Sequence, residues 1–411
     1  MKKLAISMLA AVIVTAMLAG GCAKPAPAPT PAPEPPKTLN IGIITPLTGG
    51  SAFIGTVMQN GILLAMDVQN EQGGVTIAGQ KYLLNAIIRD SKADILIGKS
   101  AAEELVLDKG IKVIGGPFIG DAVGVQSVTE PNKVIAFLLT PAVPTMTGPN
   151  RPYTFFLGPP YELIYTNLAA YLQKFYPEAK TVRGTGPDLA DLPIFEAAAQ
   201  TVLPQYGLEW LGVEKFPAST RDFTPVISRL LAKKPDVVDT TSTPGSLGAI
   251  YALMVKQLRQ AGFNGIIITP GIPPPGVMEE LVPKQFLTKI ITIEVDPDSP
   301  IVSQAYRDVH YRAKAKYNET PSPLVHQCYN VLKGFFEFLN GQDTMDTTAW
   351  MEGFAKYHWQ GIYGFESYWM GKKKYGIDRR TFRGAWASEY KDGKLDTNFT
   401  APIPYDMFVE K

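Results

Sequence analysis

The residues LNIGIITPLTGGS, 39–51, decide the fold of this chain. Leu39 to Ile44 is an apolar run with the length of a buried β-strand, and a turn-rich loop follows it. Met58 and Ile62 then lie on one face of a helical pattern that stops before Gly73-Gly74. We therefore predict a strand, a loop and a helix in succession, which is how a parallel α/β sheet begins.

The same alternation continues along the chain and starts again after Phe155. Near-continuous apolar strands between amphipathic helices favour a parallel sheet covered on both faces, and the restart predicts a second α/β unit over about 156–295. Expected strands lie at 82–90, 111–114, 134–139, 181–184, 236–241, 266–269 and 288–295. Expected helices lie at 93–109, 195–206, 222–233, 247–261, 302–317 and 325–340, and a hairpin is expected around 391–394.

Composition sets limits on both size and partners. The chain has 411 residues, 45% of them hydrophobic, which suffices for two domains. Without Lys2 and Lys3, its 39 basic residues become 37 against 38 acidic ones, a net charge of −1. This balance argues against a nucleic-acid partner, which would favour a basic excess.

The first 22 residues have the character of a secretory leader. Lys2 and Lys3 precede the apolar run Leu4–Leu18, and small residues lead to Cys22. This order resembles a bacterial lipoprotein signal peptide, 1–22, which implies acylation of Cys22; an uncleaved signal anchor is the alternative. The Pro-rich segment 23–37 predicts an extended polyproline tether to the membrane.

Cys328 is then the single remaining cysteine, so the folded part contains no intramolecular disulfide. It lies in a predicted helix with no activating pattern around it, and we expect it to be buried and structural.

A series of short motifs runs in order from Leu39 to Leu395. They are Pro46-Leu47-Thr48-Gly49, Gly55, Gly61, Ala65, Asn70, Gly73-Gly74, Ile114-Gly115-Gly116-Pro117, Asp222-Phe223-Thr224-Pro225, Lys234-Pro235-Asp236-Val237-Val238, Lys256-Gln257, Ala261-Gly262, Pro321, Tyr329, Gly361, Gly364-Phe365 and Asp392-Gly393-Lys394. Each motif is weak alone, but together their order and spacing resemble the leucine/isoleucine/valine-binding proteins of branched-chain amino acid importers.

That resemblance implies an α/β, type I periplasmic-binding-protein fold. Two doubly wound parallel-sheet lobes would be joined by a hinge of three crossings, with a ligand cleft at the carboxyl ends of the strands. Lobe 1 would comprise 38–155 plus 296–364, and lobe 2 would comprise 156–295 plus 365–411. The crossings would lie near Phe155, Val295 and Gly364.

Loops between a strand and a helix suit a carboxylate ligand, because helix N-termini present unpaired N–H groups and partial positive charge. The candidate ligand-binding residues in lobe 1 are Ser51, Phe53, Phe118, Ile119, Gly120, Asp121 and Thr140. Those in lobe 2 are Asp191, Thr243 and Gly271.

The amino-acid clamp of the family is largely missing from these loops. In the family's amino-acid binders, a serine, the threonine of an Ala-Thr pair and an acid from lobe 2 hold the ligand. Here Gly120 takes the serine position, Gly271 the acid position, and Thr140-Pro141-Ala142 is not followed by Ala-Thr. The resemblance therefore leans towards an aromatic or otherwise apolar carboxylate rather than a branched-chain amino acid.

Several of these side chains have structural interpretations as well. Asp121 could bind a cationic or hydroxyl-bearing ligand, or cap the helix that starts near Ala122. Phe53 and Phe118 could stack on a ligand or pack beneath the loop. Arg89-Asp90 could be a structural ion pair.

Motifs for catalysis are absent from the sequence. His310, predicted on a solvated helix face, His326 and His358 lack metal-ligand spacing, and Leu189 breaks the dinucleotide pattern begun by Gly184-Thr185-Gly186. No nucleophile elbow or phosphate-binding Walker loop occurs, although a glycosidase carboxylate pair stays open. We expect no enzyme, cofactor or metal.

The predicted function is an extracytoplasmic solute-binding lipoprotein that captures a small amino-acid-like, carboxylate or aromatic solute by hinge closure. Its expected partners are the solute, the permease and ATPase subunits of an ABC importer, and the membrane through its lipid anchor, with the chain itself a monomer. The alternatives are a ligand-sensing lipoprotein that signals to a receptor and a structural lipoprotein without a ligand.

Overall fold

A computed structural model describes residues 35–139, 146–158, 160–189, 192–242, 248–269, 276–382 and 386–400. Contacts divide the chain into Met1–Pro36 and Lys37–Lys411, and every described helix and strand belongs to the second unit. Within these described ranges no helix has both the length and the apolar character needed to cross a membrane. The leader, Cys22 and most of the Pro-rich segment lie outside the described residues.

The first sheet has nine strands in the order β12-β13-β14-β6-β5-β4-β1-β3-β2. The strands from β14 to β3 are parallel to one another, while β2, β12 and β13 are antiparallel to their neighbours. Their bounds are β1 Lys37–Thr45, β2 Val75–Ile77, β3 Gln80–Asp90, β4 Val113–Phe118, β5 Ile135–Leu139, β6 Thr154–Phe156, β12 Trp359–Gln360, β13 Glu366–Met370 and β14 Arg380–Phe382.

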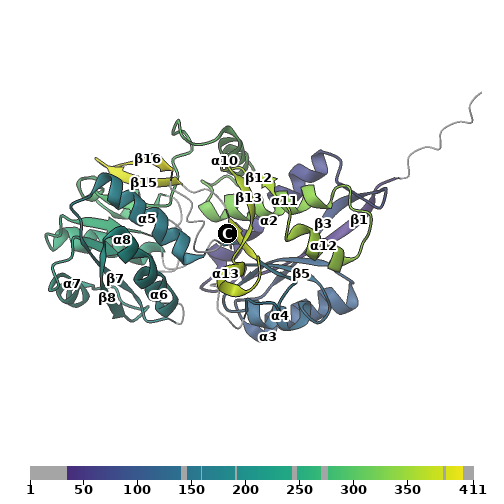
Figure 1. Cartoon of the computed structure of the whole chain (residues 1–411), viewed down its shortest axis with the longest axis horizontal. Helices are drawn as coiled ribbons and strands as arrows, with labels where there is room; N and C mark the ends of the chain where they lie inside the picture. Colours follow the sequence, from purple (N-terminus) through teal and green to yellow (C-terminus); the bar gives the residue numbers. More distant parts are fainter. Residues whose placement is uncertain are drawn as a thin grey trace, which may run out of the picture. The chain divides into compact units, whose positions relative to one another are not determined.

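Helices cover both faces of this sheet (Figure 1). Against one face pack α2 (Ala52–Glu71), α10 (Gln304–Tyr317), α11 (Pro323–Leu339) and α12 (Thr347–Phe354), and against the other α3 (Ile95–Glu103) and α4 (Ala122–Thr129). A turn of π-helix, Glu104–Asp108, extends α3 to Gly110, whose φ of +64° ends the predicted helix. Cys328 is completely buried in α11, as predicted.

The second sheet has seven strands in the order β16-β15-β11-β10-β9-β7-β8. The five strands from β8 to β11 are parallel, and an antiparallel hairpin closes one edge. The bounds are β7 Thr181–Pro187, β8 Glu209–Phe216, β9 Val237–Asp239, β10 Ile266–Ile268, β11 Ile290–Thr292, β15 Trp386–Lys391 and β16 Lys394–Thr400.

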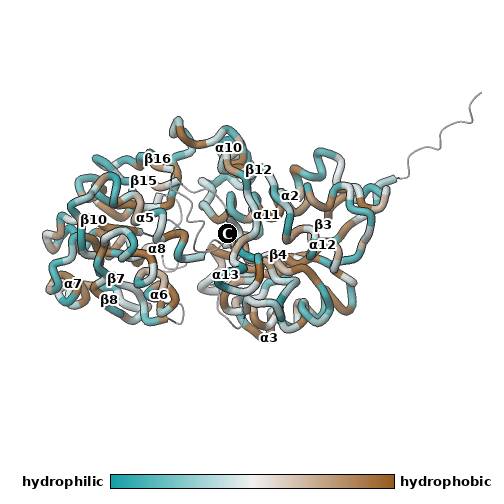
Figure 2. Tube along the Cα trace, in the orientation of Figure 1, coloured by the Kyte–Doolittle hydropathy of each residue, from teal (hydrophilic) through white to brown (hydrophobic). Residues whose placement is uncertain are grey.

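Two separate apolar clusters fill the two faces of the second sheet. One contains α5 (Tyr161–Phe175) and α6 (Leu192–Val202), and the other α7 (Thr224–Leu231), α8 (Gly248–Gln260) and α9 (Val277–Leu281). Apolar and polar residues alternate along the covering helices (Figure 2), as expected for helices with one face on a sheet. Two α/β units with mostly parallel sheets confirm the predicted fold class.

The strand pairing revises one lobe boundary. Residues 365–382, which the sequence assigned to the second lobe, contribute β13 and β14 to the first sheet. Trp369 of β13 packs its ring 4.7 Å from Phe155, inside the first core, which explains this placement. The chain therefore passes to the second sheet between β14 and β15 rather than near Gly364. The chain also changes sheets between β6 and α5 and between β11 and α10.

Candidate functional site

The loops that follow β1, β3 and β4 lie side by side, because these strands are neighbours in the first sheet. Asp90, the last residue of β3, holds the first of them. Its Oδ1 accepts the N–H groups of Leu47 (2.8 Å) and Lys92 (2.9 Å), and its Oδ2 accepts the Thr48 hydroxyl (2.6 Å). Burial works to raise the pKa of Asp90, but these bonds outweigh burial and hold that pKa below its ordinary value.

The sequence suggested an ion pair between Arg89 and Asp90, and this interpretation is wrong. Arg89 instead donates to both oxygens of Glu104, from Nε at 2.8 Å and from Nη2 at 2.5 Å. Successive residues of a strand point to opposite faces, so Arg89 is directed to the side covered by α3 and its π turn, away from the Asp90 side chain.

Asp121 joins the loops after β3 and β4. It occupies the N-cap position of α4, as predicted, but its side chain makes no capping bond to the helix. Its Oδ1 accepts the Phe118 N–H at 2.7 Å, and its Oδ2 accepts the Ser91 hydroxyl. The carboxyl is fully buried, and burial raises the pKa of Asp121 to about 6. The Asp121 side chain thus links the loops after β3 and β4 by hydrogen bonds and does not cap α4.

Gly120 has no room for a side chain. A Cβ at this position would lie 2.1 Å from the carbonyl oxygen of Ala93 and 2.9 Å from its carbon. Lys92 and Ala93 both have left-handed φ angles, +54° and +58°, so their backbone is already in an uncommon conformation. The serine expected at this position in amino-acid binders therefore cannot be accommodated by this loop.

The remaining described candidates differ in exposure. Ser51 stands at the N-cap of α2 without a side-chain capping bond and is partly exposed. Phe53 and Phe118 are half-buried and pack against the first core, which supports their structural interpretation while leaving part of each ring accessible. Ile119 is 39% exposed. Thr140, Asp191, Thr243 and Gly271 lie outside the described residues.

The second sheet also carries a buried carboxylate at the end of a parallel strand, which the sequence reasoning missed. Asp239, the last residue of β9, accepts the Tyr165 hydroxyl at 2.7 Å and the Thr241 N–H at 2.8 Å. Burial raises the pKa of Asp239. The available signal was an acidic residue directly after Val237 and Val238, at the end of an apolar run.

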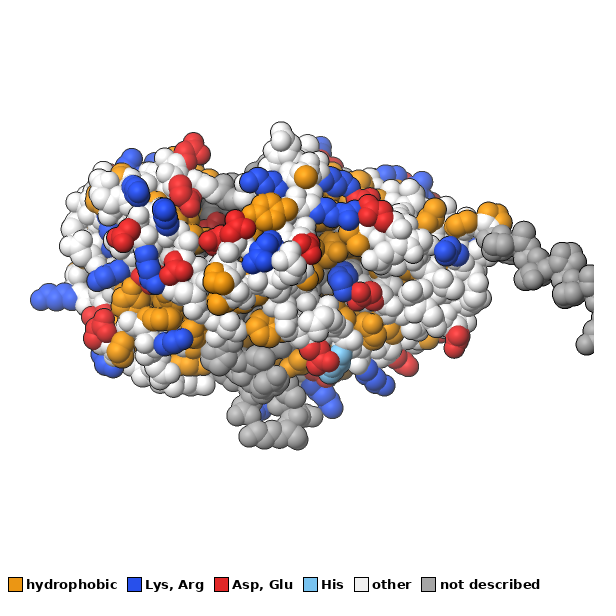
Figure 3. All heavy atoms as spheres, turned by 90° about the horizontal axis from the view of Figure 1, so that it is seen from above, with side chains coloured by type: hydrophobic (Ala, Val, Ile, Leu, Met, Phe, Trp, Pro, Cys, Tyr) orange, Lys and Arg blue, Asp and Glu red, His pale blue; other side chains and the backbone are white. Residues whose placement is uncertain are grey.

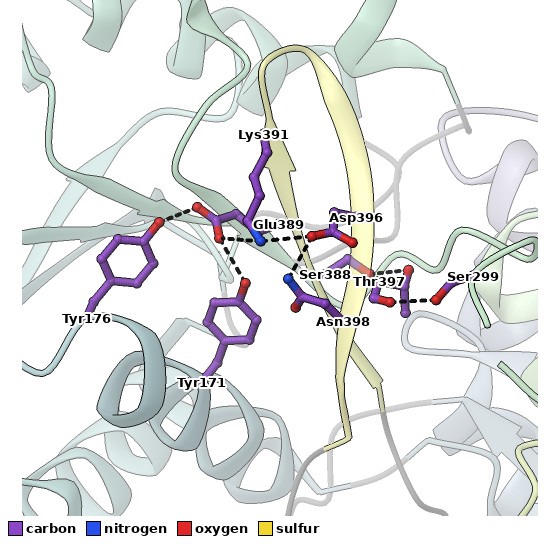
Figure 4. Close-up of polar contacts among 9 residues, drawn as sticks. All are labelled: Tyr171, Tyr176, Ser299, Ser388, Glu389, Lys391, Asp396, Thr397 and Asn398. Atoms are coloured by element: carbon purple, nitrogen blue, oxygen red, sulfur yellow. Dashed lines mark hydrogen bonds and ion pairs between the residues drawn. The ribbon is translucent and has the colours of Figure 1, made fainter. Parts of the chain in front are cut away.

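The hairpin of β15 and β16 is hydrogen-bonded to the segment between β11 and α10, which is the second of the three connections between the sheets (Figure 4). The Ser299 hydroxyl donates to the Thr397 carbonyl at 2.6 Å, and the Asp296 N–H donates to the Thr397 hydroxyl at 2.7 Å. Ser388 donates to the Glu294 carbonyl at 2.5 Å. This connection is therefore held to β15 and β16 by several buried polar contacts.

A second group of contacts in Figure 4 fixes the same hairpin to α5. Glu389 accepts hydrogen bonds from the hydroxyls of Tyr171, at 2.8 Å, and of Tyr176. On the exposed edge, the Lys391 ammonium lies 2.8 Å from Asp396 and 3.8 Å from Glu389. The hairpin thus contacts both α5 and the second connection.

Acidic and histidine side chains do not gather into a metal site in the described part of the chain: no group of three or more His, Cys, Asp or Glu residues is suitably placed there.

Comparisons with known proteins agree with this architecture. The branched-chain amino acid transporter substrate-binding protein LivJ from Streptococcus pneumoniae, in complex with isoleucine, superposes with a TM-score of 0.71 at 18% identity, covering 89% of this chain and 99% of that one. A solute-binding protein of an ABC transporter from Rhodopseudomonas palustris BisB5, in complex with 3,4-dihydroxybenzoic acid, gives 0.69 at 19% identity, covering 90% and 99%. At these identities the likeness establishes the fold alone.

Sequence comparison is more specific. Leu/Ile/Val-binding protein homolog 3 of Brucella melitensis biotype 1 is 29% identical over 240 residues, which make up 56% of this chain and 60% of that protein. The match thus spans less than two thirds of that relative's length. The sequence profile described as periplasmic binding protein matches residues 38–394. This family implies an extracytoplasmic location. The chain therefore belongs to the periplasmic binding protein family, with relatives of the Leu/Ile/Val-binding type.

Proposed function

We propose that this chain is the solute-binding lipoprotein of an ABC importer and that its solute is a small aromatic or apolar carboxylate. The observation that carries the choice of solute is the closed backbone at Gly120, where a serine of the amino-acid clamp has no space. The loops that remain offer helix N-termini, which suit a carboxylate, and partly accessible rings at Phe53 and Phe118, which suit an apolar body.

The proposed binding residues are the ten predicted from the sequence. Of the described ones, Ser51 is the N-cap residue of α2 and Phe53 lies in its first turn, while Phe118 ends β4 and Ile119 and Gly120 follow it before α4. Asp121 would act through these neighbours, because it is fully buried and its bonds hold the loop in position. Closure of two lobes around the solute would then favour the bound form, since contacts to both lobes exist only when the cleft is closed.

The family relatives support the range of solutes without selecting one. The related structures named above hold isoleucine in one protein and 3,4-dihydroxybenzoic acid in another, so this fold accommodates both an amino acid and an aromatic acid. The Gly120 backbone favours the second type for this chain.

Anchoring to the outer face of the membrane is part of the same proposal. Removal of the residues before Cys22 would leave the acylated Cys22 as the mature N-terminus and 23–37 as the tether, and a permease with its ATPase would receive the solute. Replacement of Cys22 by serine should move the protein from the membrane fraction to the soluble fraction. Mass spectrometry of the mature N-terminus should show a diacyl modification on the wild-type chain alone.

The solute is tested by a thermal-shift screen of the full chain in detergent against leucine, isoleucine, valine, benzoate and hydroxybenzoates. A ligand at 100 times its dissociation constant adds about 2.7 kcal/mol of stability. We expect aromatic acids to raise the melting temperature and leucine to leave it unchanged. A shift with leucine and none with the acids would refute the solute class, and no shift with any compound would refute solute binding in this range.

A pair of variants locates the site. Phe118→Ala should weaken binding of the responding acid at least tenfold in calorimetry, because it removes an apolar wall of the site. Phe175→Ala, at a partly exposed phenylalanine in the last turn of α5, is the matched control and should leave the affinity unchanged. Equal loss in both variants would place the effect outside the proposed loops.

A further inference from the structure

A pocket of about 310 Å³ opens at the second connection between the sheets. Its walls come from α9, from Glu294–Asp298 after β11, from α10, from the segment before α11, and from β15 and β16. None of the described residues predicted to bind the solute lines it. Figure 3, which views the molecule from above, shows acidic side chains beside a hollow in this face.

The pocket is strongly acidic. Four carboxyl groups line it, on Glu279, Glu294, Asp296 and Asp298, and Lys314 is the only lysine or arginine in its described lining. Burial and the neighbouring Glu279 raise the pKa of Glu294 to about 8, so near neutral pH this carboxyl holds a proton. A positive charge in the pocket would relieve the mutual repulsion of these groups.

Tyrosines hold two of the carboxyls in place. The Tyr390 hydroxyl donates to Glu279 at 2.8 Å and lies 3.4 Å from a Glu294 oxygen. The Tyr311 hydroxyl lies 2.7 Å and 2.8 Å from the two oxygens of Asp298. The carboxyl groups are thus arranged around a space with aromatic walls, rather than free on a solvated surface.

His310 gives an independent indication of a ligand. The sequence placed it on a solvated helix face, but its side chain is only 6% exposed, stacked against His326 with ring centroids 5.3 Å apart. It lines the pocket, and its Nδ1 has no hydrogen-bond partner among the residues that the structure describes. Burial, followed by the charge of Lys314, lowers the pKa of His310 to about 4, so the ring is neutral. A buried ring nitrogen without a partner is uncommon and costs stability, unless a bound molecule satisfies it.

We propose that this pocket is a second binding site, specific for a small organic cation carrying a primary ammonium group. An ammonium donates three hydrogen bonds and can be shared by several carboxyl oxygens, while Tyr306, Tyr311 and Tyr390 suit its alkyl body and its charge. A metal ion is a poorer fit, since the described His, Cys, Asp and Glu side chains form no group of three close enough to coordinate one. The volume corresponds to roughly ten water molecules at ~30 Å³ each, which suits a short amine or diamine. This site goes beyond the proposed solute function and does not depend on it.

The probe is 1,4-diaminobutane, titrated into the full chain by calorimetry at constant ionic strength. We expect saturable binding at one site, weakened at least tenfold by Asp296→Asn and by Glu279→Gln. Both replacements keep the hydrogen-bond acceptors used by the Asp298 N–H and by Tyr390. Asp308→Asn, on α10 but outside the pocket, is the matched control and should bind as the wild type does. The ring ¹⁵N resonances of His310 should shift on titration.

Absence of saturable binding at millimolar diamine would overturn the proposal, and so would equal weakening in all three variants, which would indicate general charge attraction. Addition of benzoate in a separate titration keeps the two proposals apart. Binding of benzoate without binding of the diamine would refute the second site and leave the solute function standing. Binding of the diamine without binding of benzoate would support the second site and count against the proposed solute class.

Discussion

Gly120→Ser restores the side chain that amino-acid binders use, and the structure predicts that this chain will not tolerate it. The new Cβ would lie 2.1 Å from the Ala93 carbonyl oxygen. Carbon atoms pack best at about 3.5–4.0 Å, so the two loops must separate by more than an ångström. A backbone oxygen cannot rotate away as a flexible side chain can, and Ala93 is already left-handed.

The separation should also disturb the contact between the same two loops at Asp121. Overpacking costs about 1–3 kcal/mol, and weakening a buried hydrogen bond to a carboxylate costs about 1.5–3 kcal/mol. We therefore expect Gly120→Ser to lower the free energy of unfolding by roughly 3 kcal/mol. Urea denaturation followed by tryptophan fluorescence measures this loss, because Trp350 and Trp369 are buried in the core of the first sheet.

Gly50→Ser is the matched control, since an added Cβ there meets nothing within 4 Å. It should change the free energy of unfolding by less than about 0.5 kcal/mol. Equal midpoints for the two variants would show that the Ala93 contact does not restrict this loop. Leucine binding by a stable Gly120→Ser protein would go further and refute the argument for an aromatic or apolar solute.

Substitutions at three further positions test other parts of the molecule. Burial and the neighbouring Glu279 raise the pKa of Glu294 to about 8, from 4.5 for an exposed glutamate. Its contribution to stability is therefore fully present below pH 4.5 and is lost as the pH rises through 8. Glu294→Gln should therefore flatten the fall in urea midpoint between pH 5 and 8, and an unchanged slope would contradict the burial argument. Asp90→Ala should cost about 2–4 kcal/mol by removing the acceptor of three hydrogen bonds, whereas Asp90→Asn, which keeps an acceptor, should cost less in the same assay. Gly61→Ala places a Cβ 2.5 Å from the Val325 carbonyl oxygen, where α2 approaches α11 closely, and should lower the free energy of unfolding by about 1–3 kcal/mol. A melting temperature equal to that of the wild type would disprove this close approach.

The local periodicity of apolar residues in the sequence predicted most of the strands and helices. Apolar runs such as Leu39–Ile44 predicted the central parallel strands, and glycines such as Gly110 marked helix ends, because these signals arise within a few neighbouring residues. The edge strand β8 was missed, since most of its side chains are only partly buried and it has no continuous apolar run. The burial of Cys328 followed from its place on the apolar face of a long helix.

For the candidate site, the sequence located the loops but not the partners of their side chains. Asp121 was expected to bond within its own helix, but its partner Ser91 is 30 residues away along the chain. The lack of space at Gly120 depends on how closely Ala93 approaches, which no local pattern reports.

Tertiary packing alone decided the membership of β13 and the surroundings of His310. Trp369 joined the first sheet because its ring fits beside Phe155, more than 200 residues earlier in the chain. His310 is buried because α11 brings His326 against it. The sequence by itself determined where strands, helices and loops occur, because those depend on neighbouring residues. Which side chains contact one another, and which of them are charged, depended on contacts between distant segments that exist only once the chain has folded.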